Sequence, residues 1–307
     1  MITQAAREKS TTQQPVADAR PVQSQLRGTV LMLISTVFFS GSDIVTKGLA
    51  GAVPAVEIAW IRYATFSVLV IPLLMMNGSG TLLRSQHPWL QVLRGLGTVG
   101  SALLFTAGLR FLQVADATAI YFISPILIMA LSIVFLGEKV GWRRWSAAAV
   151  GLLGVLIVIR PGTGAFNVAA LLPLCGATSW AAAAVVTRKM SGRDHSLTTL
   201  AWSAFVGFAL LSVLLPFSWV TPSWGEIGLG VCVGIFSTIG HWFVILAYRH
   251  ANASTIAPFS YIQLIWAAIL GYFVFNALPD QWTVIGAAVI AASGLYTAYR
   301  ERVRAKG

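Results

Sequence analysis

Residues 132–146 read SIVFLGEKVGWRRWS and place one acidic and three basic residues between two long apolar stretches. Residues 117–137 before this segment and 145–159 within and after it contain no Asp, Glu, Lys or Arg. A run of about 20 apolar residues is long enough to cross a bilayer as a helix. The charged segment carries Trp142 and Trp145, and tryptophan and basic residues accumulate at membrane surfaces. We therefore expect a tight turn at the membrane surface between two transmembrane helices.

The composition of the whole chain excludes a soluble protein. Of its 307 residues, 57% are hydrophobic and 10% are charged, whereas soluble domains carry about 25% charged residues. The apolar runs do not alternate with polar residues as the strands of a membrane barrel do, so they are predicted to be helices. We expect an all-α membrane protein with ten transmembrane helices. The predicted helices span residues 27–48, 54–76, 88–110, 116–137, 142–160, 167–189, 196–216, 225–248, 252–276 and 281–299.

Several classes of function are excluded by the same sequence. The formal net charge is +11, but the basic residues are spread over loops and tails beside the membrane, which does not indicate a nucleic-acid partner. Cys175 and Cys232 lie inside apolar runs and give neither a disulfide framework nor a metal site. Residues 95–100, GLGTVG, match a dinucleotide fingerprint, but they lie inside a predicted membrane helix without the required strand. Helix packing through Gly97 explains the glycines better. We expect no cofactor, no metal and no enzymatic activity.

The distribution of basic residues predicts the orientation in the membrane. Sixteen of them fall on the side of the N-terminus and three fall on the other side. Cytoplasmic loops carry an excess of Lys and Arg, so both termini are predicted to be cytoplasmic, in a cell membrane that would be the inner membrane of a Gram-negative cell. The polar residues 1–26 are expected to form a disordered tail and residues 301–307 a basic tail. The sixteen residues are Arg7, Lys9, Arg20, Arg27, Arg84, Lys139, Arg143, Arg144, Arg188, Lys189, Arg193, Arg249, Arg300, Arg302, Arg304 and Lys306, and the other three are Lys47, Arg110 and Arg160.

An internal repeat divides the chain into two halves. Trp142, Gly154 and Arg160 recur at Trp282, Gly294 and Arg300, each 140 positions later. The repeat predicts two five-helix halves at residues 27–160 and 161–300. Five is an odd number, so the second half would enter the membrane upside down relative to the first. Inverted repeats of this kind are typical of secondary transporters, which hold their substrate near the midplane between the halves.

The run FLGEKVGWRRWSAAAVGLLGVLIVIR, residues 135–160, resembles the turn and fifth helix of the drug/metabolite transporter superfamily, EamA type. The resemblance implies a carrier, usually an exporter, of small metabolites such as amino acids. Among its branches, the aromatic amino-acid exporter type is nearest in composition. One position departs from the family pattern, because Asn276 stands where the second half aligns with Glu138.

Charged residues at membrane depth are candidates for function, because a charge in the bilayer is costly to keep. Asp43 and Lys47 lie one turn apart in the first predicted helix, and Glu57 and Arg62 lie in the second. We expect these four residues to form an ion-pair cluster that either gates or braces the outer mouth. His241 lies deep in the eighth helix, where it either titrates near neutral pH or hydrogen-bonds a neighbouring carbonyl.

Tryptophans deep in the membrane indicate a wet cavity, because an indole N–H needs a hydrogen-bond acceptor. Small polar residues and tyrosines accompany them at helical spacing, so a largely apolar and aromatic passage with a few hydroxyl groups is predicted. The same positions also suit ordinary contacts between helices. The predicted cavity residues are Ser42, Trp60, Tyr121, Trp180, Trp202, His241, Tyr261 and Trp266.

Two prolines interrupt predicted helices at corresponding places in the two halves. Pro125 lies in the fourth helix and Pro258 in the ninth. A proline inside a helix frees the carbonyl four residues earlier, and broken helices in both halves are a sequence sign of a transporter site. We expect both prolines to act as hinges.

These observations predict a secondary transporter that exports small metabolites by alternating access around a central cavity. The predicted cargo is an amino acid with an apolar or aromatic side chain, and the other partner is membrane lipid. A nucleotide-sugar, cofactor or drug-like cargo and a channel-like protein remain as alternatives. The mode of energy coupling also remains open, with proton antiport and facilitated diffusion as the two alternatives.

Overall fold

The computed structural model describes residues 22–76, 84–137, 142–160, 167–190, 194–250 and 257–306. Within these ranges the regular structure is helical and no strand occurs. The segment that suggested a turn, which includes Glu138 and Lys139, lies partly outside the described residues. The α-helices are α1 (Val22–Leu49), α2 (Ala55–Met76), α4 (Pro88–Leu109), α5 (Val114–Tyr121), α6 (Ser124–Leu136), α7 (Trp142–Ile159), α8 (Leu171–Met190), α9 (Ser196–Leu214), α10 (Trp224–His250), α12 (Ile262–Phe275) and α13 (Gln281–Lys306).

The helices are those of a multi-pass membrane protein. Seven candidate spans in the described residues are long and apolar enough to cross a bilayer, and one of them covers α5 and α6 together. Three further apolar helices, at Ala149–Ile159, Phe259–Phe275 and Gln281–Tyr296, are shorter. The predicted count of ten transmembrane helices therefore depends on these three and stays a prediction.

The first and last helices are longer than the sequence predicted. Helix α1 begins at Val22 rather than at residue 27, and α13 continues to Lys306 rather than ending at residue 299. The end of the predicted N-terminal tail and most of the predicted C-terminal tail are thus helical. Both extensions contain residues with good intrinsic helix propensity, such as Gln, Glu, Arg, Ala and Lys, so helix formation continues beyond the apolar stretch.

The predicted fourth helix is broken, as its proline suggested. Helix α5 ends at Tyr121, a turn follows at Phe122 and Ile123, and α6 begins at Ser124, immediately before Pro125. In the second half, Pro258 lies in a 3₁₀ helix, Ala257–Tyr261, that leads into α12. By contrast, α2 runs unbroken through Pro72.

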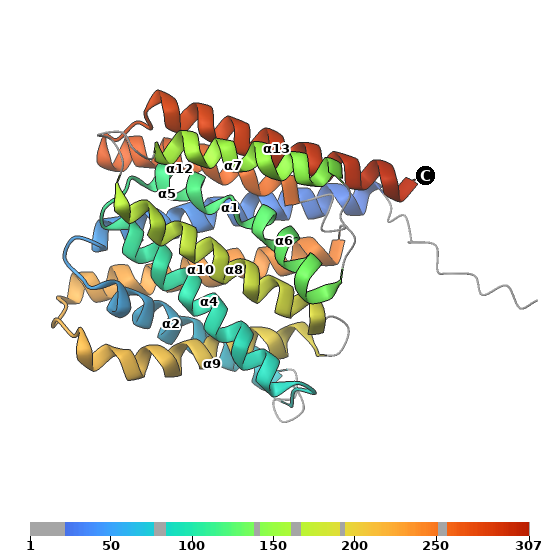
Figure 1. Cartoon of the computed structure of the whole chain (residues 1–307). Coiled ribbons are helices and arrows are strands. Elements are labelled where there is room, and N and C mark those ends of the chain that lie inside the picture. The colour runs from blue at the N-terminus through green and yellow to red at the C-terminus, as the bar shows by residue number, and fades with distance from the viewer. Residues whose placement is uncertain are drawn as a thin grey trace, which may run out of the picture.

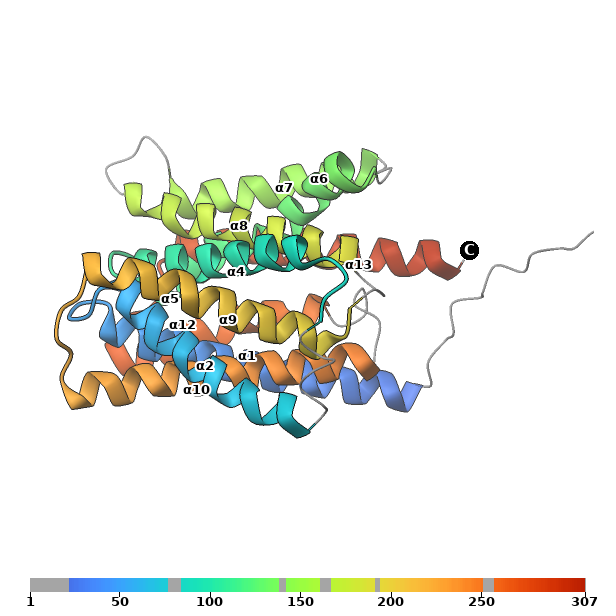
Figure 2. The same cartoon turned by 90° about the horizontal axis from the view of Figure 1, so that it is seen from below.

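The helices lie side by side in a bundle with two distinct ends (Figure 1). At one end, which we call the Asp280 end, the loop before α13 meets the end of α7 through an ion pair of 2.6 Å between Asp280 and Arg160. At the other, the Asp194 end, the loop before α9 meets the loop before α4 through a 2.5 Å hydrogen bond from Ser85 to Asp194. The start of α1 and the end of α13 both lie at the Asp194 end (Figures 1 and 2).

The two halves of the chain contact each other in a reciprocal pattern. Helix α1 packs on α10 as α8 packs on α4, and α2 packs on α10 as α9 packs on α4. Likewise α1 packs on α12 as α8 packs on α6. Three further contacts join a helix to its equivalent in the other half: α2 with α9, α5 with α12 and α7 with α13. Exchanging the two halves maps the first three pairs of contacts onto each other and leaves the contacts between equivalent helices unchanged. Among the described helices, most contacts therefore join one half to the other.

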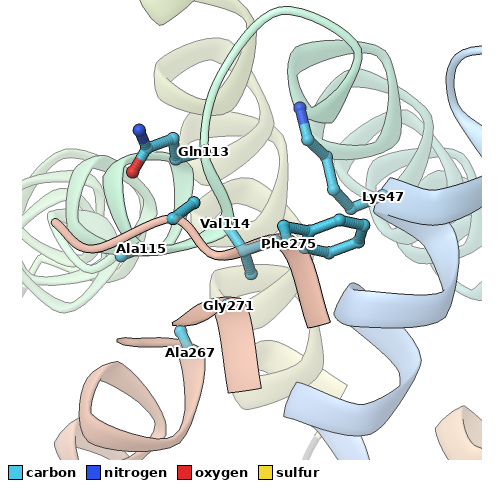
Figure 3. Close-up of a pocket in the computed structure, with 8 residues that line it drawn as sticks. Lys47, Gln113, Val114, Ala115, Ala267, Gly271 and Phe275 are labelled. Atoms are coloured by element: carbon cyan, nitrogen blue, oxygen red, sulfur yellow. The ribbon is translucent and has the colours of Figure 1, made fainter. Parts of the chain in front are cut away.

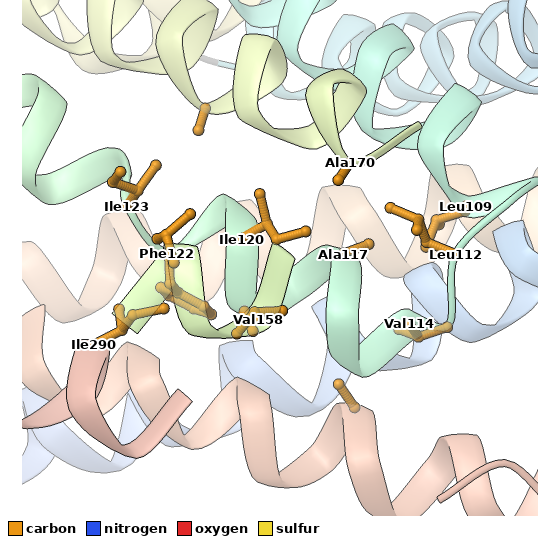
Figure 4. Packing of buried hydrophobic residues seen from close by; sticks show 14 of the residues in the cluster. Leu109, Leu112, Val114, Ala117, Ile120, Phe122, Ile123, Val158, Ala170 and Ile290 are labelled. Carbon is orange, nitrogen blue, oxygen red and sulfur yellow. The ribbon is translucent and has the colours of Figure 1, made fainter. Parts of the chain in front are cut away.

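The apolar core includes a cluster at which α5, α7 and α13 meet (Figure 4). Ile120, Val158 and Ile290 are almost completely buried there, next to the turn residue Phe122. Close contact elsewhere depends on glycine: a Cβ atom at Gly97 would lie 3.0 Å from the carbonyl oxygen of Ser179. The prediction that GLGTVG serves helix packing is confirmed by this contact between α4 and α8.

The ends of the two broken helices revise the alignment of the halves. Gly137 ends α6 with a φ of 67° and Asn276 ends α12 with a φ of 52°, both left-handed. Glycine and asparagine are the residues that most readily adopt this conformation after a helix. The structure therefore aligns Asn276 with Gly137, and Ala277 rather than Asn276 with Glu138. The second half has no glutamate at this position in either alignment, so the expected departure from the family pattern stays a prediction.

Candidate substrate site between the two halves

A polar cluster lies deep in the bundle where the halves meet, and Asp43 of α1 is its acidic member. The Gln263 side chain of α12 donates a hydrogen bond of 3.1 Å to the Asp43 carboxylate. One turn earlier in α1, the Ser40 hydroxyl donates to the backbone carbonyl of Gln263 at 3.5 Å. Asp43 is therefore a residue of the interface between the halves.

Arg62 of α2 is the basic member of the cluster. It lies on the face of α2 that contacts His241 of α10. Phe66, one turn further along the same face of α2, stacks on the His241 ring with 6.1 Å between ring centroids. Among the described residues, the Arg62 side chain has no hydrogen-bond or ion-pair partner in contact. The cluster thus contains a cation at membrane depth whose donors are unused.

Tyr121 and His241 give the cluster an aromatic surround. The Tyr121 hydroxyl shares a hydrogen bond of 2.8 Å with Ser101 of α4, and its ring packs edge-on against Phe105. Tyr121 is also the last residue of α5, so the helix break lies directly beside the cluster. The His241 ring lies between Phe66 and Phe39, whose ring centroid is 5.0 Å away. The contacts of His241 thus join the two halves, and Tyr121 packs against the apolar cluster that includes Ala267 of α12.

Other predicted cavity residues have contacts that explain them without cargo. Ser42 shares a 2.9 Å hydrogen bond with Ser237 of α10, and the Trp60 N–H donates to Ser212 of α9 at 2.8 Å. The Tyr261 ring packs on Phe122 at 5.2 Å. Trp266 differs, because its buried indole N–H has no acceptor among the described residues. Trp180 on α8 and Trp202 on α9 are half-buried.

The expected ion-pair cluster of Asp43, Lys47, Glu57 and Arg62 is not formed, since no two of these residues are in ion-pair contact. The Lys47 ammonium donates instead to the backbone carbonyls of Leu109 and Leu112, at 2.7 and 2.8 Å. The last carbonyls of a helix lack partners within it, so the end of α4 attracts this cation.

Glu57 is likewise held apart from the other three residues. Its carboxylate accepts a hydrogen bond of 3.3 Å from the backbone N–H of Val220. A role of the four residues in gating or bracing stays a prediction.

A small cavity lies beside Lys47 at the Asp280 end (Figure 3). Val114 of α5 and Ala267, Gly271 and Phe275 of α12 line it, and its volume is about 30 Å³. A cavity of this size accommodates a water molecule but not a metabolite. Helices α1, α5 and α12 are therefore closely packed at this end of the bundle.

Each end of the bundle holds a polar network that links the halves. At the Asp280 end, the Thr283 hydroxyl donates to Asp116 and the Thr283 N–H donates to Asp280, both at 2.7 Å. Although burial raises the pKa of Asp280, the hydrogen bonds from Thr283 and the charge of Arg160 lower it overall.

At the Asp194 end, burial raises the pKa of Asp194, but hydrogen bonds from Ser85, Gln86 and Gln91 lower it overall. Arg94 of α4 reaches both α8 and α9, through the Thr187 hydroxyl at 2.8 Å and the Thr199 carbonyl at 3.1 Å. The two networks join the halves at opposite ends of the bundle.

Gln263, Arg94 and Asp280 were not among the predicted site residues. Gln263 could have been found, because it is a lone amide in an apolar run and lies three positions before Trp266, on the same helix face. The Thr187 and Thr199 partners of Arg94 and the Arg160 partner of Asp280 are far away in the sequence and leave no local signal. Among the described residues, no group of three His, Cys, Asp or Glu side chains could hold a metal ion.

Comparison with known proteins agrees with this architecture. The sequence model of the EamA-like transporter family matches residues 26–160 and again residues 167–299. A solved crystal structure with 18% sequence identity superposes with a TM-score of 0.64 and covers 90% of this chain and 98% of its own. That likeness shows the fold alone.

Curated relatives are similar over almost their full length. An S-adenosylmethionine uptake transporter of Rickettsia prowazekii is 30% identical over 282 residues, 92% of this chain and 95% of its own. A riboflavin transporter of Vibrio cholerae is 28% identical and covers 87% and 91% of the two chains. The pseudopaline exporter CntI of Pseudomonas aeruginosa is 28% identical and covers 87% and 94%.

None of these three relatives is named for aromatic amino acids, so the expected likeness to the aromatic exporter branch is not supported. The relatives and the family are transporters of small molecules and not enzymes. Because the family's sequence model accounts for both halves of the chain, this protein belongs to the EamA-like transporter family and is a multi-pass membrane transporter of small metabolites.

Proposed function

We propose that the protein is a ten-helix carrier whose two inverted halves rock around the polar cluster and move a small amphipathic metabolite by alternating access. The proposed cargo carries an amino-acid group joined to an apolar or aromatic part. The observation that carries this proposal is the position of the cluster: Asp43, Arg62 and Tyr121 come from the first half, Gln263 and His241 come from the second, and all lie at membrane depth.

The helix directions support inverted halves. Helix α1 ends at the Asp280 end, where Lys47 contacts the end of α4. The chain enters α8 at the same end, because the Asn167 amide donates to the carbonyl of Phe111 at 3.5 Å. The first helices of the two halves, α1 and α8, therefore run in opposite directions. The excess of basic residues on the side of both termini supports the Asp194 end as the cytoplasmic one.

The similarity to S-adenosylmethionine uptake transporters supports the proposed cargo class. S-adenosylmethionine combines an amino-acid group with an adenine ring, so it offers both charges and an aromatic surface. Riboflavin, the substrate named for another relative, offers an aromatic surface without an amino-acid group. Export, which the family resemblance implies, is the proposed direction, although the gradient and not the fold sets the direction of net flux.

The test is uptake by purified protein in proteoliposomes. We expect saturable uptake of labelled S-adenosylmethionine or L-phenylalanine and little uptake of riboflavin. Imposing a pH gradient in separate samples will show whether a proton drives the flux. Uptake of riboflavin alone would contradict the proposed cargo class. Uptake that increases linearly with concentration for every compound would contradict the carrier mechanism.

A further inference from the structure

The inference starts from Asp43, whose carboxylate is only partly satisfied. An ionised carboxylate has about four acceptor positions, and in the described structure Gln263 is the one group that donates to it. No ammonium or guanidinium group of the described residues contacts it. A carboxylate at membrane depth without a cation in contact has room for the donors of an incoming ammonium group.

Arg62 has hydrogen-bond donors that lack acceptors. Guanidinium N–H groups form a planar fork that matches the two oxygens of a carboxylate. The Arg62 side chain uses none of these donors in contact with described residues. A cation held in the membrane without a partner is costly, so an anionic ligand would relieve that cost.

The two residues lie on α1 and α2, which both pack on α10, and they face the same region between the halves. Asp43 points to α12 through Gln263, and the face of α2 that carries Arg62 and Phe66 points to His241 of α10. Phe39, one turn before Asp43 in α1, and Phe66, one turn after Arg62 in α2, both pack on the His241 ring. Because α1 and α2 run in opposite directions, Asp43 and Arg62 both lie one turn from this ring toward the Asp280 end, without an ion pair between them. One small ligand beside His241 can therefore meet both side chains.

We propose that Asp43 and Arg62 form a two-charge site for the zwitterionic amino-acid group of the cargo, in which Asp43 binds the ammonium group and Arg62 binds the carboxylate. This assignment rests on the proposed transport function and adds the chemical group that the site recognises. Gln263 positions Asp43 by its hydrogen bond. The remainder of the cargo lies against the aromatic side chains of Tyr121 and His241.

Trp266 adds an independent observation at the same place. Its indole N–H is buried without an acceptor among the described residues, and a buried unpaired donor is unfavourable. Trp266 lies three positions after Gln263 in α12, on the same helix face. An oxygen or nitrogen acceptor on the cargo would pair with this N–H.

The first experiment uses the wild-type protein and needs no substitution. Binding to purified protein is measured by calorimetry for L-phenylalanine and S-adenosylmethionine. The comparison compounds are phenethylamine, which lacks the carboxylate, 3-phenylpropionate, which lacks the ammonium group, and 5′-methylthioadenosine, which lacks the amino-acid group and the sulfonium charge. Removal of either charge should weaken binding about ten- to a hundredfold, as expected for a lost charge-assisted hydrogen bond.

The second experiment assigns each charge to its residue. Arg62→Gln should weaken L-phenylalanine binding by the same factor and leave phenethylamine binding unchanged. Asp43→Asn should weaken L-phenylalanine binding and leave 3-phenylpropionate binding unchanged. Arg62→Lys should bind L-phenylalanine more tightly than Arg62→Gln but less tightly than the wild type, because lysine keeps the positive charge and lacks the planar pair of N–H donors. The matched controls are Arg110→Gln, an exposed position after α4, and Glu226→Gln near the start of α10.

The outcomes separate this inference from the proposed function. If the wild-type protein binds L-phenylalanine or S-adenosylmethionine but binds the one-charge compounds equally well, the two-charge site is wrong and the transport function stands. If it binds neither zwitterion, both the proposed cargo class and this site are wrong. A variant that misfolds affects neither conclusion, since the binding series on the wild-type protein is sufficient to decide between them.

Discussion

Gly154 of α7 and Gly286 of α13 face each other where the last helices of the two halves cross. A Cβ atom on Gly154 would lie 2.9 Å from the Gly286 carbonyl oxygen, and one on Gly286 would lie 2.6 Å from the Gly154 carbonyl oxygen. Backbone atoms cannot move aside as the end of a side chain can. The contact between the halves at this point therefore depends on the absence of both side chains.

Gly154→Ala is expected to destabilise the protein by about 1–3 kcal/mol, the usual cost of overpacking a close contact. The measurement is the thermal unfolding temperature of the purified variant in detergent. The matched control is Gly228→Ala in α10, where no atom lies within 4 Å of an added Cβ atom. This control should unfold at the wild-type temperature or above it, because alanine favours the helix. Equal behaviour of the two variants would contradict the role of the glycine contact.

The ion pair between Asp280 and Arg160 predicts a stability that depends on acid pH. The pKa of Asp280 is lowered from its ordinary value of 3.8, so its contribution is present above that value and is lost as the pH falls below it. Both side chains are partly exposed, with 43% and 30% of their surface accessible, so the pair contributes at most about 1 kcal/mol. Asp280→Asn keeps an acceptor for the Thr283 N–H and removes the charge.

We expect Asp280→Asn to lower the unfolding temperature by a constant amount near neutral pH, and this difference should shrink below about pH 4. Unfolding temperatures of both proteins across the acid range provide the measurement. A difference that stays the same in strong acid would show that the charge of Asp280 does not contribute.

The orientation is tested by labelling from outside the cell. Gly51 and Pro222 lie in loops at the Asp280 end, whereas Gln86 lies at the Asp194 end. Cysteines placed at Gly51 and Pro222 should react with a membrane-impermeant reagent, and one at Gln86 should not. The background variant replaces Cys175 and Cys232, which are both exposed, with alanine. The reverse labelling pattern would place the termini outside.

The helix break at Tyr121 predicts a hinge. Pro125→Ala supplies an N–H that can bond the Tyr121 carbonyl, so it should join α5 to α6, stiffen the break and slow transport while cargo binding changes less. Pro258→Ala should act similarly in the second half. Pro72→Ala is the control, because α2 is already continuous at that proline. Transport at the wild-type rate in both variants would leave the prolines as static packing features.

The sequence predicted the features that depend on local pattern. The apolar runs located the helices, Pro125 located the break before α6, and the glycines of α4 indicated close packing. Contacts between distant residues were not predictable in this way. Asp43 and Gln263 are 220 positions apart, and neither hydrophobic periodicity nor residue type pairs them.

The four charged residues show the same limit of local reasoning. Their spacing brought Asp43, Lys47, Glu57 and Arg62 near one another along two adjacent helices. The structure separates them, because the free carbonyls at the end of α4 attract Lys47 and the loop before α10 holds Glu57. Asp43 and Arg62 remain as the pair that faces the second half. Their surroundings come from α5, α10 and α12, which only the folded arrangement brings together.

Alternating access around a site between the halves is the central claim, and counterflow in proteoliposomes tests it most directly. Vesicles are loaded with unlabelled S-adenosylmethionine or L-phenylalanine and diluted into the labelled compound. A carrier that reorients with its cargo should show labelled uptake that is faster than in empty vesicles and that passes through a transient maximum. Labelled uptake that is the same in loaded and empty vesicles would contradict the account and indicate a channel.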